Sequence, residues 1–408
     1  MLYNGSMPNH NIPILSISQA LSLAPIPAIT LVSGIVGVNM APSPALATLG
    51  STLAVVGLAV ATIPAAMVMK RVGRQRGFIG AAVLAGMATL LIAYALSQEN
   101  FALFCLAAFL VGSTSAAVAH YRFAAAESVS PEQASKAISF VMIGGIFAGY
   151  LGPEVVKRTG DWLEAAPYSA SFLILAGFYL VVIILLVFFR EVPPTEELVS
   201  GVERPLRVIA RQPAFMLAVV ASAVGYGVMT LIMTATPVNM HLIHGFSLEE
   251  TAWVIQSHVI AMFLPSLFTG YLLIRLGIQR MMLIGLVCLF ACIGIGYYSQ
   301  VVMHYWWALV LLGIGWNFMF VSGTTLLTHS YRPSERFKAQ ATNDFTVFGV
   351  QALASLSAGA LLAISNWQVL TLLTLPFLIA LCIGIIVLRK RIFTTPEPQI
   401  ALDTVTTE

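Results

Sequence analysis

The chain has 408 residues, of which 59% are hydrophobic and 9% are charged, and its formal net charge is +3 at pH 7. Soluble domains carry roughly 25% charged residues, so this composition excludes a water-soluble globular protein. A mean hydropathy of +0.90 indicates many apolar helices in a lipid bilayer. The small net charge gives no reason to expect a nucleic-acid partner.

Twelve apolar segments follow one another along the chain. A helix rises about 1.5 Å per residue, so about 20 residues cross the roughly 30 Å of hydrocarbon in a bilayer. We therefore predict an all-α polytopic membrane protein with twelve transmembrane helices. The predicted spans are 14–38, 45–69, 77–96, 101–120, 138–156, 169–189, 214–238, 250–273, 281–299, 306–327, 345–364 and 368–388.

A polar stretch between the sixth and seventh spans divides the chain. Residues 190–213 contain several charged side chains and the adjacent prolines Pro193 and Pro194. This composition is typical of a connection outside the membrane. The predicted parts are an N-terminal six-helix bundle over 1–189, a cytoplasmic linker over 190–213, a C-terminal six-helix bundle over 214–391 and a cytoplasmic tail over 392–408.

The basic residues predict the orientation. When the N-terminus is placed in the cytoplasm, all Lys and Arg residues except Lys157 and Arg158 fall on the cytoplasmic side. Cytoplasmic loops of membrane proteins carry such an excess. With an even number of spans, both termini are predicted to be cytoplasmic, and the expected location is a bacterial inner (plasma) membrane.

The chain contains an internal repeat of about half its length. The basic loop from Arg71 to Arg76 (RVGRQR) returns from Arg275 to Arg280 (RLGIQR), and Pro131 has a counterpart in Pro333. A period this long is too large for a solenoid unit and indicates a duplicated membrane domain. We predict that the two six-helix bundles are related by a pseudo-twofold axis.

Polar side chains are unevenly distributed among the spans. Spans 1, 4, 7 and 10 are rich in Ser, Thr, Asn and Gln, whereas spans 3, 6, 9 and 12 contain fewer such residues. Unpaired polar groups are costly in hydrocarbon, so the polar spans should face a protein interior or a water-filled cavity. Every third helix is therefore predicted to lie on the outside, against lipid.

Some polar and aromatic residues share a helix face and form the predicted substrate-binding set. Residues one turn apart lie on the same face, as Tyr226, Thr230 and Thr234 do. The repeat places Ser22 of the first span opposite Tyr226. Hydrogen bonding between packed helices is the alternative role for such residues. The set is Gln19, Ser22, Tyr226, Thr230, Thr234, Trp316, Asn317, Thr324, Phe348 and Gln351.

This arrangement resembles the major facilitator superfamily over essentially the whole chain. The family has six plus six helices and a basic loop after spans 2 and 8, whose usual form is Gly-x-x-x-Asp-Arg-x-Gly-Arg-Arg. Arg71, Gly73 and Arg74 match that loop. The chain departs from the pattern at Ala66, Lys70 and Gln75. The resemblance implies transport by alternating access, in which two bundles rock around a central site.

The resemblance also bears on the latch at the cytoplasmic side. In the family, the acidic residue of the basic loop holds the start of span 11, and Lys70 stands at that position here. Asp344 begins predicted span 11, where the helix N-terminus favours a carboxylate. We expect Asp344 to pair with Lys70 or Arg71, with a simple charge at a helix end as the alternative.

Two similar groups of ionisable residues follow spans 4 and 10. Arg122 is followed by Glu127, and Arg332 is followed by Glu335. Their symmetry favours ion pairs between the bundles that break during rocking, rather than contact with the substrate. The predicted gating set is Lys70, Arg71, Gly73, Arg74, Arg122, Glu127, Arg275, Arg332 and Asp344.

A proton-driven transporter needs a titratable group at membrane depth. The candidates for coupling are His258 in span 8 and Glu154 at the outer end of span 5. The alternatives are a structural histidine and an external surface charge. No cofactor and no metal site are predicted, because His241 and His244 lack a fixed third ligand.

Glycines in span 5 bear on the direction of transport. Gly144, Gly145, Gly149 and the pair Gly152-Pro153 partly match the antiporter pattern of the superfamily, and close helix packing is the alternative explanation. The run from Gly315 through Phe345 resembles a bacterial branch for which multidrug and vitamin-type substrates are proposed.

We predict a secondary active transporter, not an enzyme, that moves a small organic solute by alternating access. Protons are the expected coupling ion, with antiport and export favoured. The alternatives are an importer of a vitamin-like or metal-chelate solute, and a non-transporting receptor or assembly partner. The expected partners are the solute, the proton and the lipid bilayer, and the chain is expected to act as a monomer.

Overall fold

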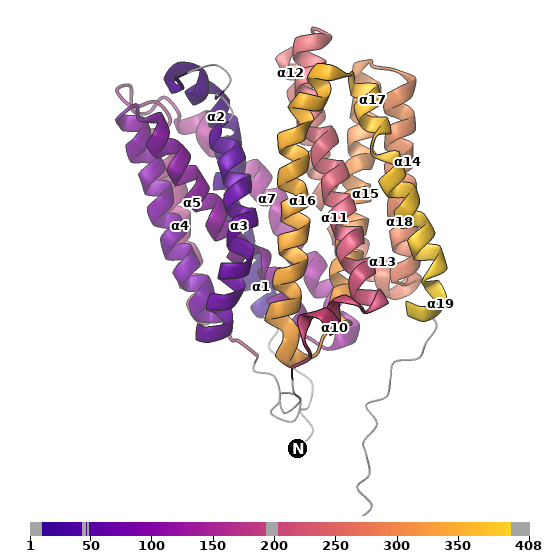
Figure 1. Cartoon of the computed structure of the whole chain (residues 1–408). Helices are drawn as coiled ribbons and strands as arrows, with labels where there is room; N and C mark the ends of the chain where they lie inside the picture. The colour runs from indigo at the N-terminus through magenta and orange to yellow at the C-terminus, as the bar shows by residue number, and fades with distance from the viewer. Residues whose placement is uncertain (1–9, 43–45, 47–48, 193–202, 393–408) are drawn as a thin grey trace, which may run out of the picture.

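The computed structural model describes residues 10–42, 46, 49–192 and 203–392, and every regular element within them is helical. Long helices run roughly side by side (Figure 1). The all-α prediction is confirmed for this part of the chain.

The N-terminal half, drawn from indigo to magenta in Figure 1, ends with α8. Its first span is broken into two helices at Pro25, which has no N–H group for the helix ladder. Its helices are α1 (Asn11–Leu23), α2 (Pro25–Met40), α3 (Leu49–Val72), α4 (Arg74–Ser97), α5 (Phe101–Ala119), α6 (Tyr121–Glu127), η2 (Pro131–Gln133), α7 (Ala134–Thr159) and α8 (Ser169–Phe188).

The C-terminal half, drawn from pink to yellow, begins after the linker. Its helices are α10 (Leu206–Ala210), α11 (Pro213–Pro237), η3 (Val238–Ile243), α12 (Leu248–Phe263), α13 (Ser266–Leu276), α14 (Ile278–Tyr298), α15 (Val302–Thr328), η4 (Pro333–Glu335), α16 (Arg336–Ile364), α17 (Trp367–Leu372), α18 (Leu375–Val387) and α19 (Arg389–Ile392).

These helices are consistent with the twelve predicted spans. In the described chain, 10 helices are long and apolar enough to cross a membrane, and the pair α12–α13, bent by 42°, makes up to 11. The remaining predicted span, 345–364, lies within α16. By length and composition, up to 11 of the predicted spans are therefore found in the described chain.

Burial distinguishes the polar spans from the apolar ones. In the most apolar stretch of α15, 83% of the residues are buried, against 39% in α8 and 33% in α17–α18. α15 is the predicted polar span 10, whereas α8 and α17–α18 are the apolar spans 6 and 12. Their burial agrees with a polar interior and with apolar helices turned outward.

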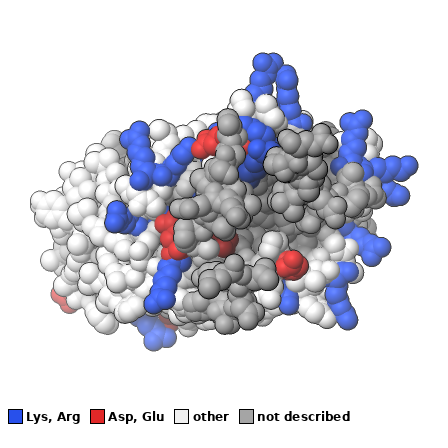
Figure 2. All heavy atoms as spheres, turned by 90° about the horizontal axis from the view of Figure 1, so that it is seen from below, with Lys and Arg blue, Asp and Glu red and all other residues white. Residues whose placement is uncertain are grey.

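The two halves meet along a few helices. α3 packs against α16, and α7 packs against α12, α13 and α15. Figure 1 shows α3 and α16 close together at the bottom and apart at the top. Lys and Arg gather at the bottom (Figure 2). We call this the basic end, where Arg71 lies in the last turn of α3, Arg275 lies in the last turn of α13 and Arg389 begins α19. We call the other end the opposite end.

The sequence repeat is also a repeat in backbone conformation. Gly73, between α3 and α4, has φ 85° and ψ 162°, and Gly277, between α13 and α14, has φ 80° and ψ 158°. Essentially only glycine adopts this region without strain. Both halves thus make the same turn at the basic end.

Candidate functional site

A buried ion pair joins the two halves near the basic end. Nη2 of Arg122, in α6, donates to Oδ1 of Asp344, in α16, at 2.5 Å, and the side chains are only 4% and 0% exposed. The Arg122 guanidinium also lies over the rings of Phe123 and Phe320, at 4.5 and 4.7 Å from their centroids. Losing one partner of a buried pair leaves the other charge uncompensated. This contact therefore favours a closed basic end.

Arg74, at the start of α4, is the centre of a second group of contacts. Its guanidinium donates to both carboxylate oxygens of Glu127, at 2.7 and 3.1 Å. It also donates to Oε1 of Gln340, in α16, at 2.9 Å. Gln340 in turn donates to Glu127 at 3.0 Å. The planar, forked guanidinium makes these contacts together, so Arg74 binds the N-terminal half to α16.

Arg336, at the start of α16, reaches back to the N-terminal half. It donates to Glu127 and to Glu191, each at 3.1 Å. The ring of Phe337 lies 5.0 Å from the Arg74 guanidinium and 4.8 Å from that of Arg336. Glu191 also accepts a 2.7 Å hydrogen bond from the backbone N–H of Arg74. The basic end is thus closed by a network that alternates cations and carboxylates.

Two residues of the linker add further contacts, which we call the linker clasp. Glu203 accepts hydrogen bonds from Lys70 at 2.8 Å and Lys338 at 3.3 Å. Arg204 donates to Glu335 at 2.7 and 2.6 Å. Burial opposes ionisation of Glu335, but hydrogen bonds from the Arg204 side chain and from two backbone amides outweigh it and lower the pKa of Glu335 to about 2. The clasp ties the linker to both halves.

The partner of Asp344 differs from the expected one. Asp344 pairs with Arg122 rather than with Lys70 or Arg71, and Lys70 pairs with Glu203. The reason is the start of α16 at Arg336, two turns before Asp344. The carboxylate therefore lies inside the bundle, beyond the exposed end of α3.

The side chains of three residues of the predicted gating set form no ion pair with the described residues. Arg71 is exposed. Arg275 is exposed and lies over the ring of Tyr271, at 5.1 Å. Arg332 is exposed, and its backbone N–H donates to Glu335 at 3.0 Å. The gate is therefore asymmetric, although the sequence around it is repeated.

Four aromatic rings of the C-terminal half cluster beside the buried ion pair. The Tyr226 ring meets the rings of Trp316, Phe320 and Phe348 edge-on, at centroid distances of 5.1, 5.1 and 5.7 Å. Trp316 and Phe320 stack at 5.3 Å. We call these four residues the aromatic box. Phe320 stands one turn after Trp316 but does not belong to the predicted substrate-binding set.

Several buried polar atoms have no hydrogen-bond partner among the described residues. An unpaired buried polar group costs about 1–3 kcal/mol, so such atoms indicate where a solute or water binds. Gln351 lies one turn beyond Phe348 on the same helix, α16. The atoms within the predicted substrate-binding set are Ser22 Oγ, Trp316 Nε1, Thr324 Oγ1 and Gln351 Oε1.

Asn317 is held within its own half. Its amide nitrogen donates to the carbonyl oxygen of Met262 and to Oγ of Ser266, each at 2.7 Å. Its oxygen accepts from the Thr269 hydroxyl at 2.8 Å. Both N–H groups are thus used to fasten α15 to the break between α12 and α13.

Three other members of the predicted substrate-binding set lie in different surroundings, one in the N-terminal half and two in the C-terminal half. Gln19 is buried where α1 packs against α7. Thr230 is buried, with its hydroxyl 3.9 Å from the sulfur of Met229. Thr234 is exposed. A role for these three in binding stays a prediction.

The two predicted coupling residues lie apart from the gate. Glu154 accepts a 2.5 Å hydrogen bond from Arg158, one turn later on α7, and the pair is at the opposite end. His258 is fully buried, with Nδ1 2.8 Å from the carbonyl oxygen of Leu309. Because a carbonyl only accepts, that nitrogen carries the proton. Neither contact joins one half to the other.

Close packing accounts for the glycines of α7. A Cβ atom at Gly144 or Gly152 would come within 2.4 Å of the Ser16 carbonyl oxygen or 2.1 Å of the Ala24 carbonyl oxygen. Small residues let membrane helices approach each other. The glycines therefore carry no separate indication of antiport.

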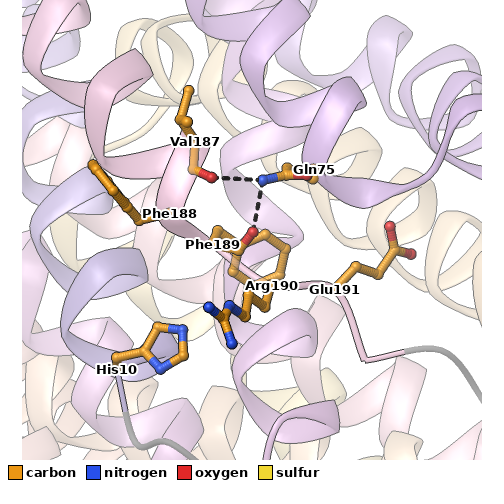
Figure 3. Close-up of a pocket in the computed structure, with 7 residues that line it drawn as sticks. All are labelled: His10, Gln75, Val187, Phe188, Phe189, Arg190 and Glu191. Atoms are coloured by element: carbon orange, nitrogen blue, oxygen red, sulfur yellow. Dashed lines mark hydrogen bonds between the residues drawn. The ribbon is translucent and has the colours of Figure 1, made fainter.

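A cavity of about 830 Å³ lies at the basic end, beside the end of α8 (Figure 3). Gln75 points across it and donates to the carbonyl oxygens of Val187 and Phe189 at 2.9 and 2.7 Å. Gln75, one of the departures from the family's loop, thus caps the last turn of α8. The lining residues are His10, Gln75, Val187, Phe188, Phe189, Arg190 and Glu191, and none belongs to the aromatic box.

The fold and this arrangement define a polytopic membrane transporter. The family model of the Major Facilitator Superfamily matches residues 11–342 and 226–406. The riboflavin transporter RfnT of Brucella anthropi is 39% identical over 385 residues, covering 93% of this chain and 96% of the relative. The chain therefore belongs to the Major Facilitator Superfamily, and it is a transporter rather than an enzyme.

More distant relatives agree with this assignment. The uncharacterized MFS-type transporter YddS of Bacillus subtilis is 28% identical, covering 88% of this chain and 86% of the relative. The structure of FucP in the outward conformation has a TM-score of 0.68 at 13% identity, over 92% of this chain and 99% of that one. An outward-facing bacterial homologue of ferroportin reaches 0.70 at 13% identity, over 92% and 98%. These likenesses show the fold.

Proposed function

We propose that the protein transports riboflavin or a closely similar flavin. The supporting observation is the aromatic box, with a donor on Trp316 and an acceptor on Gln351 that have no hydrogen-bond partner among the described residues. The isoalloxazine of riboflavin is planar, aromatic and uncharged, and one edge carries hydrogen-bonding groups. Stacked and edge-on aromatic contacts suit such a ring system. The relative named as a riboflavin transporter supports the same solute.

We propose import as the direction. The basic end is proposed to face the cytoplasm of a bacterial inner membrane, because basic residues concentrate on that side. The ion pairs at this end then give a state that is closed to the cytoplasm. The expectation of export rested on the glycines of α7, and close packing explains those glycines. The alternative of a vitamin importer is therefore favoured. Protons are the proposed driving ion, and a single chain supplies both the gate and the box.

Riboflavin binding to the purified protein tests the solute. Flavin fluorescence is quenched when the ring stacks on an aromatic side chain, so titration gives the affinity directly. Trp316→Leu should weaken binding about fivefold, since one well-placed aromatic contact is worth about 1 kcal/mol. Trp307→Leu is the matched control, because Trp307 lies on the same helix but is 49% exposed.

Two results would contradict the proposal. The first is wild-type protein that fails to quench riboflavin, and the second is equal affinity for Trp316→Leu and wild type. Uptake of riboflavin into vesicles that contain the purified protein separates a transporter from a receptor, which would bind the flavin without moving it.

A further inference from the structure

We propose that Asp344 is the proton-binding group through which the proton gradient drives transport. This inference rests on the proposed function as a proton-driven importer. It gives a second role to a carboxylate of the gate, and it replaces Glu154 and His258 as the site of coupling.

The two oxygens of Asp344 have different surroundings. Oδ1 accepts from Arg122 at 2.5 Å and from the Asn343 side chain at 2.8 Å. Oδ2 is buried and has no hydrogen-bond partner among the described residues. A proton can therefore bind Oδ2 without displacing an existing hydrogen bond. The acid that forms is neutral, so the charge that holds Arg122 is lost.

Positive charge surrounds this carboxylate. The charged and titratable groups that act on Asp344 from neighbouring helices are Arg122 of α6, Arg74 of α4 and Tyr226 of α11. His120 borders the same arginines, with Nδ1 3.5 Å from Nη1 of Arg74. Once Asp344 is neutral, the buried Arg122 loses its ionic attraction to α16 and is left without a compensating charge at the boundary. This loss favours separation of the halves.

Binding and release of a proton at Asp344 then alternate with closing and opening of the basic end. In the state closed at the basic end, a hydronium ion that arrives from the opposite end gives its proton to Oδ2 and leaves as water. The weakened pair lets the basic end open. On that side Asp344 returns the proton to water, and the new carboxylate pairs with Arg122 again. One proton crosses in the same direction as the solute.

The aromatic box connects the solute to this pair. The Arg122 guanidinium lies over Phe320 at 4.7 Å, and Phe320 stacks on Trp316 at 5.3 Å. A flavin in the box would contact the ring on which Arg122 rests. The solute and the proton therefore both act on the Arg122–Asp344 pair. Coupled movement requires that two ligands influence one such contact.

Neither earlier candidate has this geometry. Glu154 pairs with Arg158 of its own helix, and His258 bonds Leu309 within the C-terminal half. Among the ion pairs of the described chain, Arg122–Asp344 joins the two halves with both side chains buried. A change of charge there acts directly on the boundary that must open.

Transport by the reconstituted full-length protein tests the proposal. Wild type, Asp344→Asn and the control Glu154→Gln are compared in two assays, riboflavin exchange without a gradient and uptake driven by an acidic exterior. The gradient should raise accumulation about tenfold in wild type and in Glu154→Gln, which corresponds to about 1.4 kcal/mol. Asp344→Asn should retain exchange and lose the stimulation. Stimulated uptake by Asp344→Asn, or its loss in Glu154→Gln, would refute the assignment.

A measurement without riboflavin separates this proposal from the choice of solute. Spin labels at Arg76→Cys and Arg280→Cys, both exposed at the basic end, report the distance between the halves once the four native cysteines are replaced. In wild type the distance should lengthen as the pH is lowered, whereas in Asp344→Asn it should be longer than in wild type at alkaline pH and should not depend on pH. If Asp344→Asn stays closed, or opens with pH as wild type does, Asp344 is not the switch, whatever the solute.

Discussion

The side-chain amide of Asn317 donates a hydrogen bond to the backbone carbonyl of Met262, at the point where α12 ends. Pro265 follows, and the helix resumes at Ser266 with a bend of 42°. A break within a membrane span frees carbonyl groups that water cannot reach, so a neighbouring helix must satisfy them. A polar residue of span 10 thus stabilises the shape of span 8.

Replacing Asn317 should therefore reduce stability more than it reduces binding. Asn317→Leu leaves the Met262 carbonyl and the Ser266 hydroxyl without their donor, which costs about 1–3 kcal/mol. Gln351→Met is the matched control, because the oxygen of Gln351 has no partner to lose among the described residues. It should leave the melting temperature nearly unchanged and weaken riboflavin binding. Equal melting temperatures for the two variants would contradict this account.

Hydropathy predicts where the helices lie but not the role of each polar residue within them. Apolar length and polar content place the helices, because the cost of burying polar groups in lipid acts on every span. The same cost does not tell a cavity from a helix break, and Asn317 lies at a break. Phe320 was missed for the converse reason, since a phenylalanine in an apolar run looks the same whether it faces lipid or solute.

The gate was harder to predict than the fold. The residue types of Arg74, Arg122 and Asp344 suggested ion pairs, but the pairing depends on where α16 begins and on linker residues such as Glu191 and Glu203. Apart from Arg74–Glu127, these contacts join positions more than a hundred residues apart. No local pattern in the sequence specifies them.

The two repeated glycines should respond differently to the same substitution. Gly73→Ala and Gly277→Ala both force an L-residue into φ near 80–85°, which costs about 1–3 kcal/mol. A Cβ at Gly73 also lies 2.7 Å from Oε2 of Glu191, whereas the space at Gly277 is open. Thermal unfolding should show both losses, and the distance between spin labels at the basic end should change for Gly73→Ala alone. Gly80→Ala, in an exposed and unobstructed part of α4, should be neutral or slightly stabilising.

Lysine at position 74, the centre of the gate, should be a poor substitute for arginine. Arg74→Lys keeps the charge but cannot bind both oxygens of Glu127 and Gln340 together. We expect a loss of about 2 kcal/mol in the free energy of unfolding, since hydrogen bonds to charged groups contribute about that much. Arg71→Lys, at an exposed position of the same loop, should stay within about 0.5 kcal/mol of wild type. If Arg74→Lys were as little affected as Arg71→Lys, the charge at position 74 would matter rather than the geometry of the guanidinium.

The linker clasp should make stability depend on pH in the acidic range. The pKa of Glu335 falls from 4.5 to about 2 on folding, so the ionised carboxylate stabilises the folded protein at every pH above about 4.5. This contribution, about 1–3 kcal/mol, disappears as the pH falls from about 4.5 through about 2. Melting temperatures of wild type and Glu335→Gln should therefore differ by a constant amount near neutral pH and converge below about 4.5. Glu132→Gln, in the corresponding turn η2 of the N-terminal half, is the control, because Glu132 is exposed. A difference between wild type and Glu335→Gln that persists undiminished at the acidic limit would mean that packing, and not the charge of Glu335, holds the linker.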